Sequence, residues 1–231
     1  MRMRMRSWLL LLSSVAAAAQ AAPPARLEIA YELLQEGKVL ADIVDRLEHG
    51  GGAYRLTETW KGRGLLALRG EIRRSSRGSV VAGGLRPQEF ADERTGREAS
   101  RARFDWTAGT LTLQYQGPPQ TVSLPADAQD RLSFLLAFAF APPGREPVSF
   151  SIADGRGVSR QVYEVAGRER VVTPAGEFDA LKLVRRKDGP DDRRGAEIWL
   201  APARGYIPVR VLVIEKDGSR IDQVATRITT P

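Results

Sequence analysis

The single histidine of this 231-residue chain is the first candidate for chemistry, because it lies in the segment EHGGGAY at residues 48–54. A histidine followed by glycines builds the oxyanion hole of some esterases. Such enzymes also need a nucleophile in a G-x-S-x-G turn, which is absent, and His49 in the oxyanion loop would leave no second histidine as the base. We therefore interpret Gly50–Gly52 as a tight turn, where glycine adopts positive φ without steric cost.

The sequence also lacks recognisable motifs for binding a metal ion or a phosphate group. The chain has no cysteine, which excludes a thiolate metal site and a disulfide framework. Asp188, Asp191 and Asp192 crowd one loop, but they lack the D-x-D-x-D-G spacing of a calcium loop, and we interpret them as solvated charges. No G-x-x-x-x-G-K loop is present, and no spacing nominates two of the 28 acidic residues as a glycosidase pair. The sequence predicts no metal, no cofactor and no enzymatic activity.

The N-terminal residues predict export. Three arginines precede an apolar run from Trp8 to Ala19, and Ala19-Gln20-Ala21 is a small-x-small cleavage site. We expect a signal peptide over residues 1–21, cleaved after Ala21, and one domain over residues 22–231 with no transmembrane segment. Without a cysteine to carry a lipid anchor, the predicted location is the bacterial periplasm.

Charge argues against nucleic acid as a partner. Removal of the three signal arginines lowers the formal net charge from +7 to +4, and the remaining basic residues are scattered between acidic ones. A nucleic-acid interface would instead gather basic and aromatic residues on one stretch. This composition is typical of a solvated surface, and weak attraction to anionic lipid head groups stays open as an alternative.

The elements expected to hold any site are β-strands. From Arg26 onward apolar and polar residues alternate with period two, and turn residues recur every eight to twelve positions, as in an antiparallel all-β fold. The fold class is mainly β: a strongly curved antiparallel sheet, either barrel or half-barrel. Predicted strands include residues 27–34, 39–48, 54–60, 67–75, 78–81, 85–92, 148–153, 159–165, 169–173 and 178–186.

One segment breaks the β pattern. PADAQDRLSFLLAFAFAPPG, residues 125–144, is apolar on all sides and ends at Pro142-Pro143-Gly144. It predicts one buried helix near residues 127–140, with Asp127 as its N-terminal cap. We expect this helix to lie on the concave side of the sheet, where it either fills the interior or covers a ligand.

Five segments in order resemble landmarks of one protein family: GLRPQEF, ARFDW, AQDRLSFLLAFAF, TPAGEFDALKL and AEIWLAPARGYIPVRV. On these the chain is similar to DUF3108, a family of exported bacterial proteins without assigned function, over essentially all of residues 22–231. The resemblance implies a periplasmic β-rich domain and supplies no catalytic residues. By a looser analogy of shape, the arrangement is similar to lipoprotein carriers, whose curved sheet and covering helices enclose acyl chains.

Two functions stay open at this point. The first is a non-enzymatic periplasmic carrier of an apolar or amphipathic envelope molecule such as a lipid. Its expected ligand-binding residues are Arg131, Leu132, Leu135, Leu136, Phe138, Trp106 and Trp199, with Arg131 at the head group. The second is an envelope-assembly or scaffold protein that works through contacts with other proteins on its strand edges.

Overall fold

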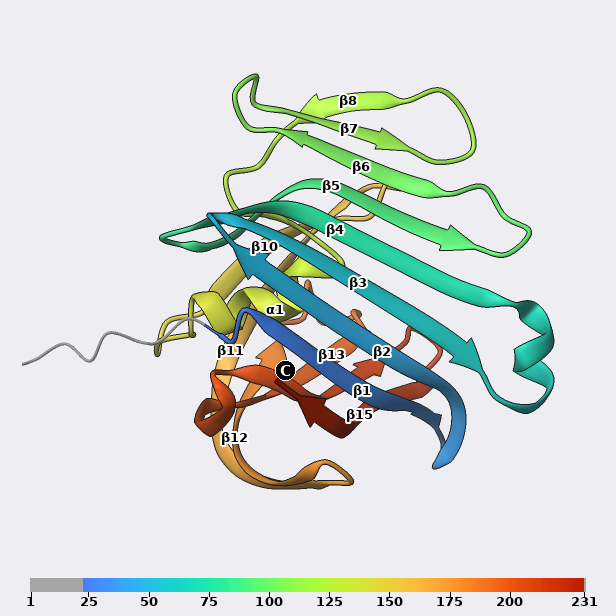
Figure 1. The fold of residues 1–231 in the computed structure, drawn as a ribbon, viewed down its shortest axis with the longest axis vertical. Helices are drawn as coiled ribbons and strands as arrows, with labels where there is room; N and C mark the ends of the chain where they lie inside the picture. The colour runs from blue at the N-terminus through green and yellow to red at the C-terminus, as the bar shows by residue number, and fades with distance from the viewer. Residues whose placement is uncertain (1–22, 231) are drawn as a thin grey trace, which may run out of the picture.

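The computed structural model describes residues 23–230, which form one 15-stranded sheet, one α-helix and two short 3-10 helices (Figure 1). The predicted signal peptide, residues 1–21, lies outside the described residues. The strands are β1 Arg26–Gln35, β2 Lys38–Gly50, β3 Ala53–Gly62, β4 Glu71–Val81, β5 Gly84–Arg94, β6 Ser100–Asp105, β7 Thr110–Gln114, β8 Gln120–Ser123, β9 Ala128–Asp130, β10 Val148–Ala153, β11 Val158–Thr173, β12 Gly176–Arg185, β13 Gly195–Ala201, β14 Ile207–Ile214 and β15 Arg220–Thr229. The helices are α1 Ser133–Phe140, η1 Gly64–Arg69 and η2 Pro202–Arg204.

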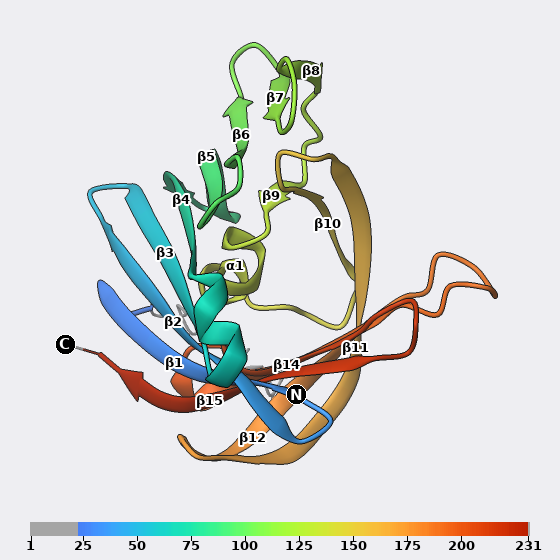
Figure 2. The same cartoon turned by 90° about the vertical axis from the view of Figure 1, so that its right-hand side faces the viewer.

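The sheet is an open, curved meander. Its strand order is β8-β7-β6-β5-β4-β3-β2-β1-β15-β14-β13-β12-β11-β10-β9, and every pair is antiparallel except the short parallel pair β9–β10. Figure 2 shows the sheet curling around α1. The edge strands β8 and β9 do not pair with each other, so the predicted curved β fold is confirmed but a closed barrel is not formed over residues 23–230.

Side-chain alternation places the core on the inner face of this curve. In β2, the side chains of Ala41, Ile43, Asp45 and Leu47 are buried, while those of the residues between them point to the other face. The same alternation in β1 and β3 buries Ile29 and Leu56. The core therefore lies between the two walls of the curled sheet, where α1 is also located.

The helix α1 is buried as predicted, although it is shorter than expected. It packs between β5 and β14, with Leu136, Ala137 and Phe138 buried. The predicted start at Asp127 is wrong, because residues 128–130 pair with β10 as strand β9. The Asp127 carboxylate instead accepts hydrogen bonds from the hydroxyls of Ser149 and Ser151 on β10, at 3.0 and 2.7 Å.

Two predicted strand breaks are also wrong, for one physical reason. The sequence predicts separate strands at residues 67–75 and 78–81, but β4 runs unbroken from Glu71 to Val81, after η1. Likewise β11 joins the strands predicted at 159–165 and 169–173. Gly78 and Gly167 lie at β-bulges, where the register shifts without ending the strand.

No helix among residues 23–230 is long and apolar enough to cross a lipid bilayer.

Candidate functional site

A hollow of about 390 Å³ lies inside the curved sheet, beside α1. Part of its wall is apolar: Phe134 and Leu135 come from α1, and Ile198, Val211 and Val213 come from β13 and β14. Charged side chains line other parts of the wall and include five arginines: Arg74, Arg131, Arg160, Arg185 and Arg194. The hollow therefore offers an amphipathic rather than a purely apolar surface.

A row of charged residues crosses the inner face of the sheet at the edge of this hollow. Asp45 on β2 is the register partner of Glu58 on β3, Glu58 of Arg74 on β4, and Arg74 of Asp92 on β5. Asp45, Glu58 and Asp92 are buried, and the Arg74 side chain is only 12% exposed. We call these four residues the charged row. Glu58 and Arg74 both line the hollow.

Arg74 is the charge that holds the row together. Its Nη1 lies 2.6 Å from Glu58 Oε1, its Nε lies 3.3 Å from Asp92 Oδ2, and its guanidinium lies 4.8 Å from the Trp60 ring centroid. Burial and the neighbouring Glu58 raise the pKa of Asp45 well above its usual range, against the opposing effect of Arg74. Burial and the Glu58 charge therefore both favour the neutral form of Asp45.

Asp92 has a different environment. Burial raises its pKa, but hydrogen bonds from Arg94 and the charges of Arg74 and Arg94 outweigh burial, and the net shift is downward. Arg94 reaches the two carboxylate oxygens of Asp92 at 3.1 and 2.9 Å. Asp92 is therefore ionised and shared between two arginines.

Another buried acid, Asp130, ties α1 to the sheet. Its Oδ1 accepts the backbone N–H groups of Leu132 and Ser133 at 2.8 Å each, which satisfies donors at the start of α1. Its Oδ2 accepts the Ser76 hydroxyl of β4 at 2.5 Å, and Ser76 is hydrogen-bonded to the Tyr54 hydroxyl of β3 at 2.9 Å. Desolvation outweighs these hydrogen bonds and raises the pKa of Asp130 to about 6.

This shift predicts how stability depends on pH. Between about pH 4 and pH 6 folded Asp130 keeps a proton that the unfolded chain has lost, so its contribution to stability falls as pH rises. Asp130→Asn carries no charge at any pH. Urea unfolding at pH 4 and pH 7 should show the variant gaining about 2–3 kcal/mol relative to the wild type at the higher pH.

As a control, Asp217→Asn removes an exposed acid whose pKa is lowered by a hydrogen bond from the Ser219 backbone N–H. This variant should show no such gain in stability at the higher pH. If the difference in unfolding free energy between the wild type and Asp130→Asn is the same at both pH values, the raised pKa of Asp130 is wrong.

The structure brings two of the predicted ligand residues to the hollow. Arg131, 48% exposed and 3.4 Å from Asp154, and half-buried Leu135 both line it. Leu132, Leu136 and Phe138 are buried in the core around the helix and do not line the hollow. The helix therefore fills the interior with some side chains and faces the hollow with Phe134 and Leu135.

The two predicted tryptophans lie elsewhere. Trp106 follows β6, stacks on Phe104 at a centroid distance of 6.4 Å, and donates its indole N–H to the Pro87 carbonyl at 2.6 Å. Trp199 on β13 donates to Glu169 and contacts the cations of Lys182 and Arg210 at 4.8 and 4.7 Å. Its strand neighbour Ile198 lines the hollow instead, since successive side chains point to opposite faces.

His49 has a structural position. Its Nε2 lies 2.8 Å from the Pro23 carbonyl oxygen and 3.1 Å from that of Pro24, and its ring meets Phe140 edge to face at 5.0 Å. Gly51 and Gly52 have φ of 57° and 79° in the β2–β3 turn, which confirms the tight-turn interpretation. Histidine thus connects the N-terminal segment to the end of α1.

The loop acids are held by arginines. Arg185 contacts Asp188 at 2.5 Å and Asp192 at 3.1 Å, and Arg194 contacts Asp192 at 2.9 Å. Asp188 is exposed, but the Asp192 side chain is only 8% exposed, so Asp192 is an ion-paired residue and not the solvated charge that the sequence predicted. Within residues 23–230 no three His, Cys, Asp or Glu side chains are grouped for a metal ion.

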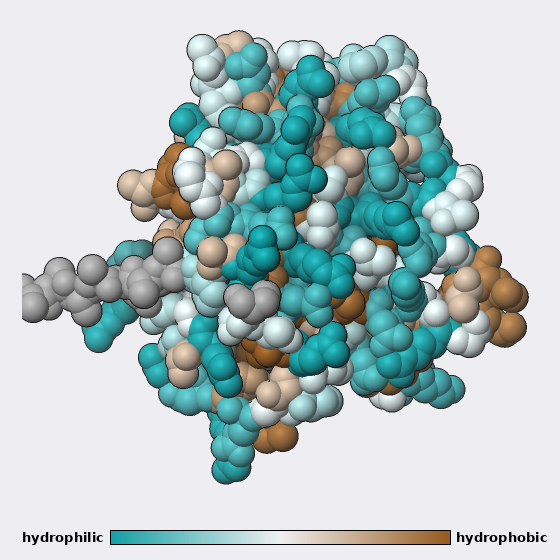
Figure 3. Space-filling model, in the orientation of Figure 1, coloured by the Kyte–Doolittle hydropathy of each residue, from teal (hydrophilic) through white to brown (hydrophobic). Residues whose placement is uncertain are grey.

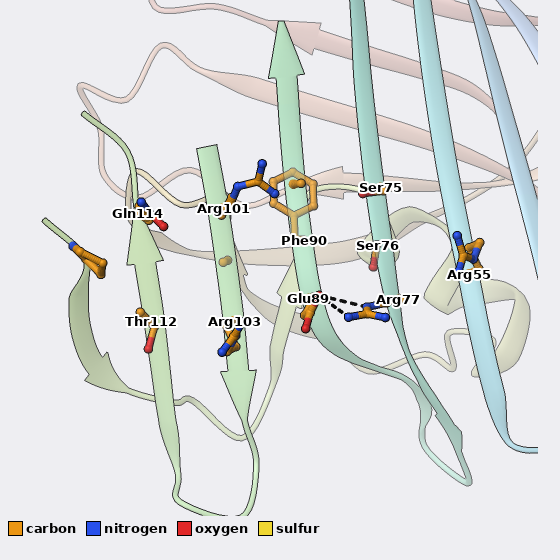
Figure 4. Close-up of a pocket in the computed structure, with 13 residues that line it drawn as sticks. Arg55, Ser75, Ser76, Arg77, Glu89, Phe90, Arg101, Arg103, Thr112 and Gln114 are labelled. Carbon is orange, nitrogen blue, oxygen red and sulfur yellow. Dashed lines mark hydrogen bonds and ion pairs between the residues drawn. The ribbon is translucent and has the colours of Figure 1, made fainter. Parts of the chain in front are cut away.

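A larger depression, about 530 Å³, lies on the outer face of β3–β7. Figure 4 shows Arg55, Arg77 and Arg103 along it, with Arg77 bound to Glu89 at 3.0 and 2.6 Å. Its ionic side chains are exposed and solvated, whereas the inner hollow joins an apolar wall to buried charges. We therefore take the inner hollow as the candidate site.

The sequence interpretation missed Glu58, Trp60 and Arg74 as site residues. A usable signal was present: Asp45, Glu58 and Arg74 occupy the same alternation phase as the apolar residues of their strands, so they must face inward. Charges at core positions mark a site or an ion-pair network.

Comparison with known proteins gives a family. The sequence profile of DUF3108, described as a protein of unknown function, matches residues 28–225. The chain belongs to the DUF3108 family. The DUF3108 match covers all strands of the hollow and α1, and it confirms the resemblance found in the sequence. No curated protein matches the chain in sequence.

Two solved structures are similar to this DUF3108 chain at a low level. One, from Bacteroides fragilis NCTC 9343, is described as an exported protein with a YmcC-like fold; it is 11% identical, with 90% of this chain and 97% of that chain covered and a TM-score of 0.39. The other, from Parabacteroides distasonis ATCC 8503, is described as a lipoprotein; it is 12% identical, with 91% and 96% covered and a TM-score of 0.37. Likenesses this weak carry no conclusion about function.

Proposed function

We propose that this DUF3108 protein is a non-enzymatic, exported periplasmic protein that binds an amphipathic, anionic cell-envelope molecule in the inner hollow. The observation that carries the proposal is the lining of that hollow, which has an apolar wall on α1 and β13–β14 and, elsewhere, five arginines against three acidic residues, Glu58, Asp188 and Glu215. Its volume of about 390 Å³ lies in the range of small-ligand sites. Export rests on the predicted signal peptide.

The chemistry of the lining suggests how such a ligand would lie. Its apolar part would contact Phe134 and Leu135, and its acidic group would meet Arg131 or Arg160, since Arg160 has no ion-pair partner among residues 23–230. The indole N–H of Trp60 also lacks a hydrogen-bond partner among these residues. Trp60 lines the hollow but this nitrogen is itself buried, so a ligand oxygen would reach it only after a shift of the wall.

Native mass spectrometry of residues 22–231, purified from a bacterial periplasm without detergent, tests the proposal. We expect an added mass that organic solvent releases and that is identified as a lipid or another acidic amphiphile. Leu135→Gln should reduce the occupied fraction severalfold, because it puts a polar group on the apolar wall. Val172→Gln, on an exposed position outside the hollow, should leave it unchanged. If the measured mass is that of the protein alone and added lipids are not taken up, the carrier proposal is wrong.

A scaffold function is the second candidate, and one observation favours it. All four residues of the edge strand β8, Gln120–Ser123, are exposed, and only one side of this strand is paired, with β7. An exposed edge can accept a strand from another protein. A measured mass of the protein alone would direct the search to partners at β8.

A further inference from the structure

The β3–β4 hairpin ends in η1, which presents two leucines to solvent. Leu65 and Leu68 are each 85% exposed, more than any other large apolar side chain among residues 23–230. In Figure 1 the teal coil that joins β3 to β4 at the right-hand edge is η1, and Figure 3 shows a brown, hydrophobic projection at that edge. Single exposed apolar residues are ordinary, but two together on one turn call for an explanation.

The turn is held in place by its neighbours. The Arg63 N–H donates to the Leu40 carbonyl at 2.8 Å, and the Glu71 N–H donates to the Thr95 hydroxyl at 3.2 Å. Gly62 lies so close to Leu66 that a Cβ at residue 62 would be 2.5 Å from the Leu66 carbonyl oxygen. These contacts hold the backbone at both ends of η1, and Leu65 and Leu68 project from it into solvent.

The surroundings of the two leucines are positively charged. Between residues 61 and 73 there are four basic residues, Lys61, Arg63, Arg69 and Arg73, and one acidic residue, Glu71. Lys61 and Arg73 share Glu71, and Arg63 is paired with Glu32 and Asp42. Arg69, next to Leu68, has no ion-pair partner in the part of the chain that the structure describes. The turn therefore joins an apolar tip to an uncompensated positive charge.

We propose that η1 docks this protein onto the surface of an anionic lipid bilayer. Leu65 and Leu68 insert at the boundary between head groups and acyl chains, and Arg69 contacts lipid phosphates. A protein partner fits the surface less well, because two side chains fall far short of the roughly 800 Å² that each partner buries in a stable interface. Interfacial insertion needs only a small apolar tip with basic neighbours.

Docking at η1 would also place the hollow near the membrane. Trp60 and Arg74, which line the hollow, belong to the two strands that η1 connects. A ligand could then pass between the bilayer and the hollow over a short path. The proposed docking does not depend on the ligand proposed for the hollow. Either proposal can therefore be wrong while the other holds.

Vesicle sedimentation tests the docking. Residues 22–231 are mixed with vesicles of phosphatidylglycerol and phosphatidylcholine, or of phosphatidylcholine alone, at low and high salt. We expect binding to the anionic vesicles that weakens severalfold as salt rises, and at least tenfold weaker binding to phosphatidylcholine. Arg69→Gln should weaken anionic binding severalfold and flatten its salt dependence.

The leucines are tested with a matched control. Leu65→Ser/Leu68→Ser should weaken binding at least tenfold and leave the thermal melting unchanged, since neither side chain is buried. Val172→Ser removes another exposed apolar side chain, 71% exposed and on the β11–β12 hairpin, and should bind as the wild type. Equal binding by the double leucine variant, or no binding of the wild type to anionic vesicles, would overturn the proposal.

Discussion

Arg74→Met is expected to lower the free energy of unfolding by about 3 kcal/mol or more at pH 7, because it leaves the buried Glu58 carboxylate without its counter-charge. Arg74 is the only cation in ion-pair contact with Glu58 among residues 23–230, and Asp45 faces Glu58 across the strands. Asp92 keeps Arg94 as a partner, so the cost arises mainly at Glu58. Chemical unfolding of the two proteins in urea measures the difference.

Two further variants separate this effect from a general loss of packing. Glu58→Gln/Arg74→Met should recover most of the lost stability, since removing both charges of a buried pair costs much less than removing one. Arg77→Met removes an arginine of the same strand whose partner Glu89 is exposed, and should cost less than about 1 kcal/mol. If the double variant is as unstable as Arg74→Met, the stability loss does not arise from breaking the Arg74–Glu58 ion pair.

Acid should reduce the Arg74→Met deficit. A protonated carboxyl leaves no unpaired charge in the interior, so the gap between wild type and variant should shrink between pH 7 and pH 4. Glu58→Gln/Arg74→Met lacks both charges of the pair, so its difference in unfolding free energy from the wild type should change much less between pH 7 and pH 4. A pH-independent deficit would indicate that methionine disturbs packing instead.

Period-two alternation was sufficient to predict most of the fold. β10, residues 148–153, has the predicted bounds, and β1–β3 differ from prediction by only a few residues. The errors arise where one residue type has two structural uses. Glycine ends strands at turns, but a Cβ on Gly78 would lie 2.1 Å from the Arg86 carbonyl oxygen, so this glycine permits close approach within a continuous sheet.

The candidate site was harder to predict because its residues come from distant strands. Apolar composition correctly placed α1 in the interior, yet which side of α1 would face an open space depends on packing against β5 and β14. Leu135 lines the hollow while its neighbour Leu136 is buried in the core. The charged row depends on register across four strands, which a single sequence does not specify.

This difference between two adjacent leucines is itself testable. Leu136→Asp should unfold the domain or remove most of its stability, because Leu136 is 2% exposed and a carboxylate there would be buried without a partner, which costs several kcal/mol. Leu135→Asp should cost only about 1–3 kcal/mol, since its side chain is half-buried and borders the hollow. Thermal melting followed by circular dichroism compares the two. Near-normal melting of Leu136→Asp would show that α1 is peripheral, and equal unfolding by both variants would show that no open space borders Leu135.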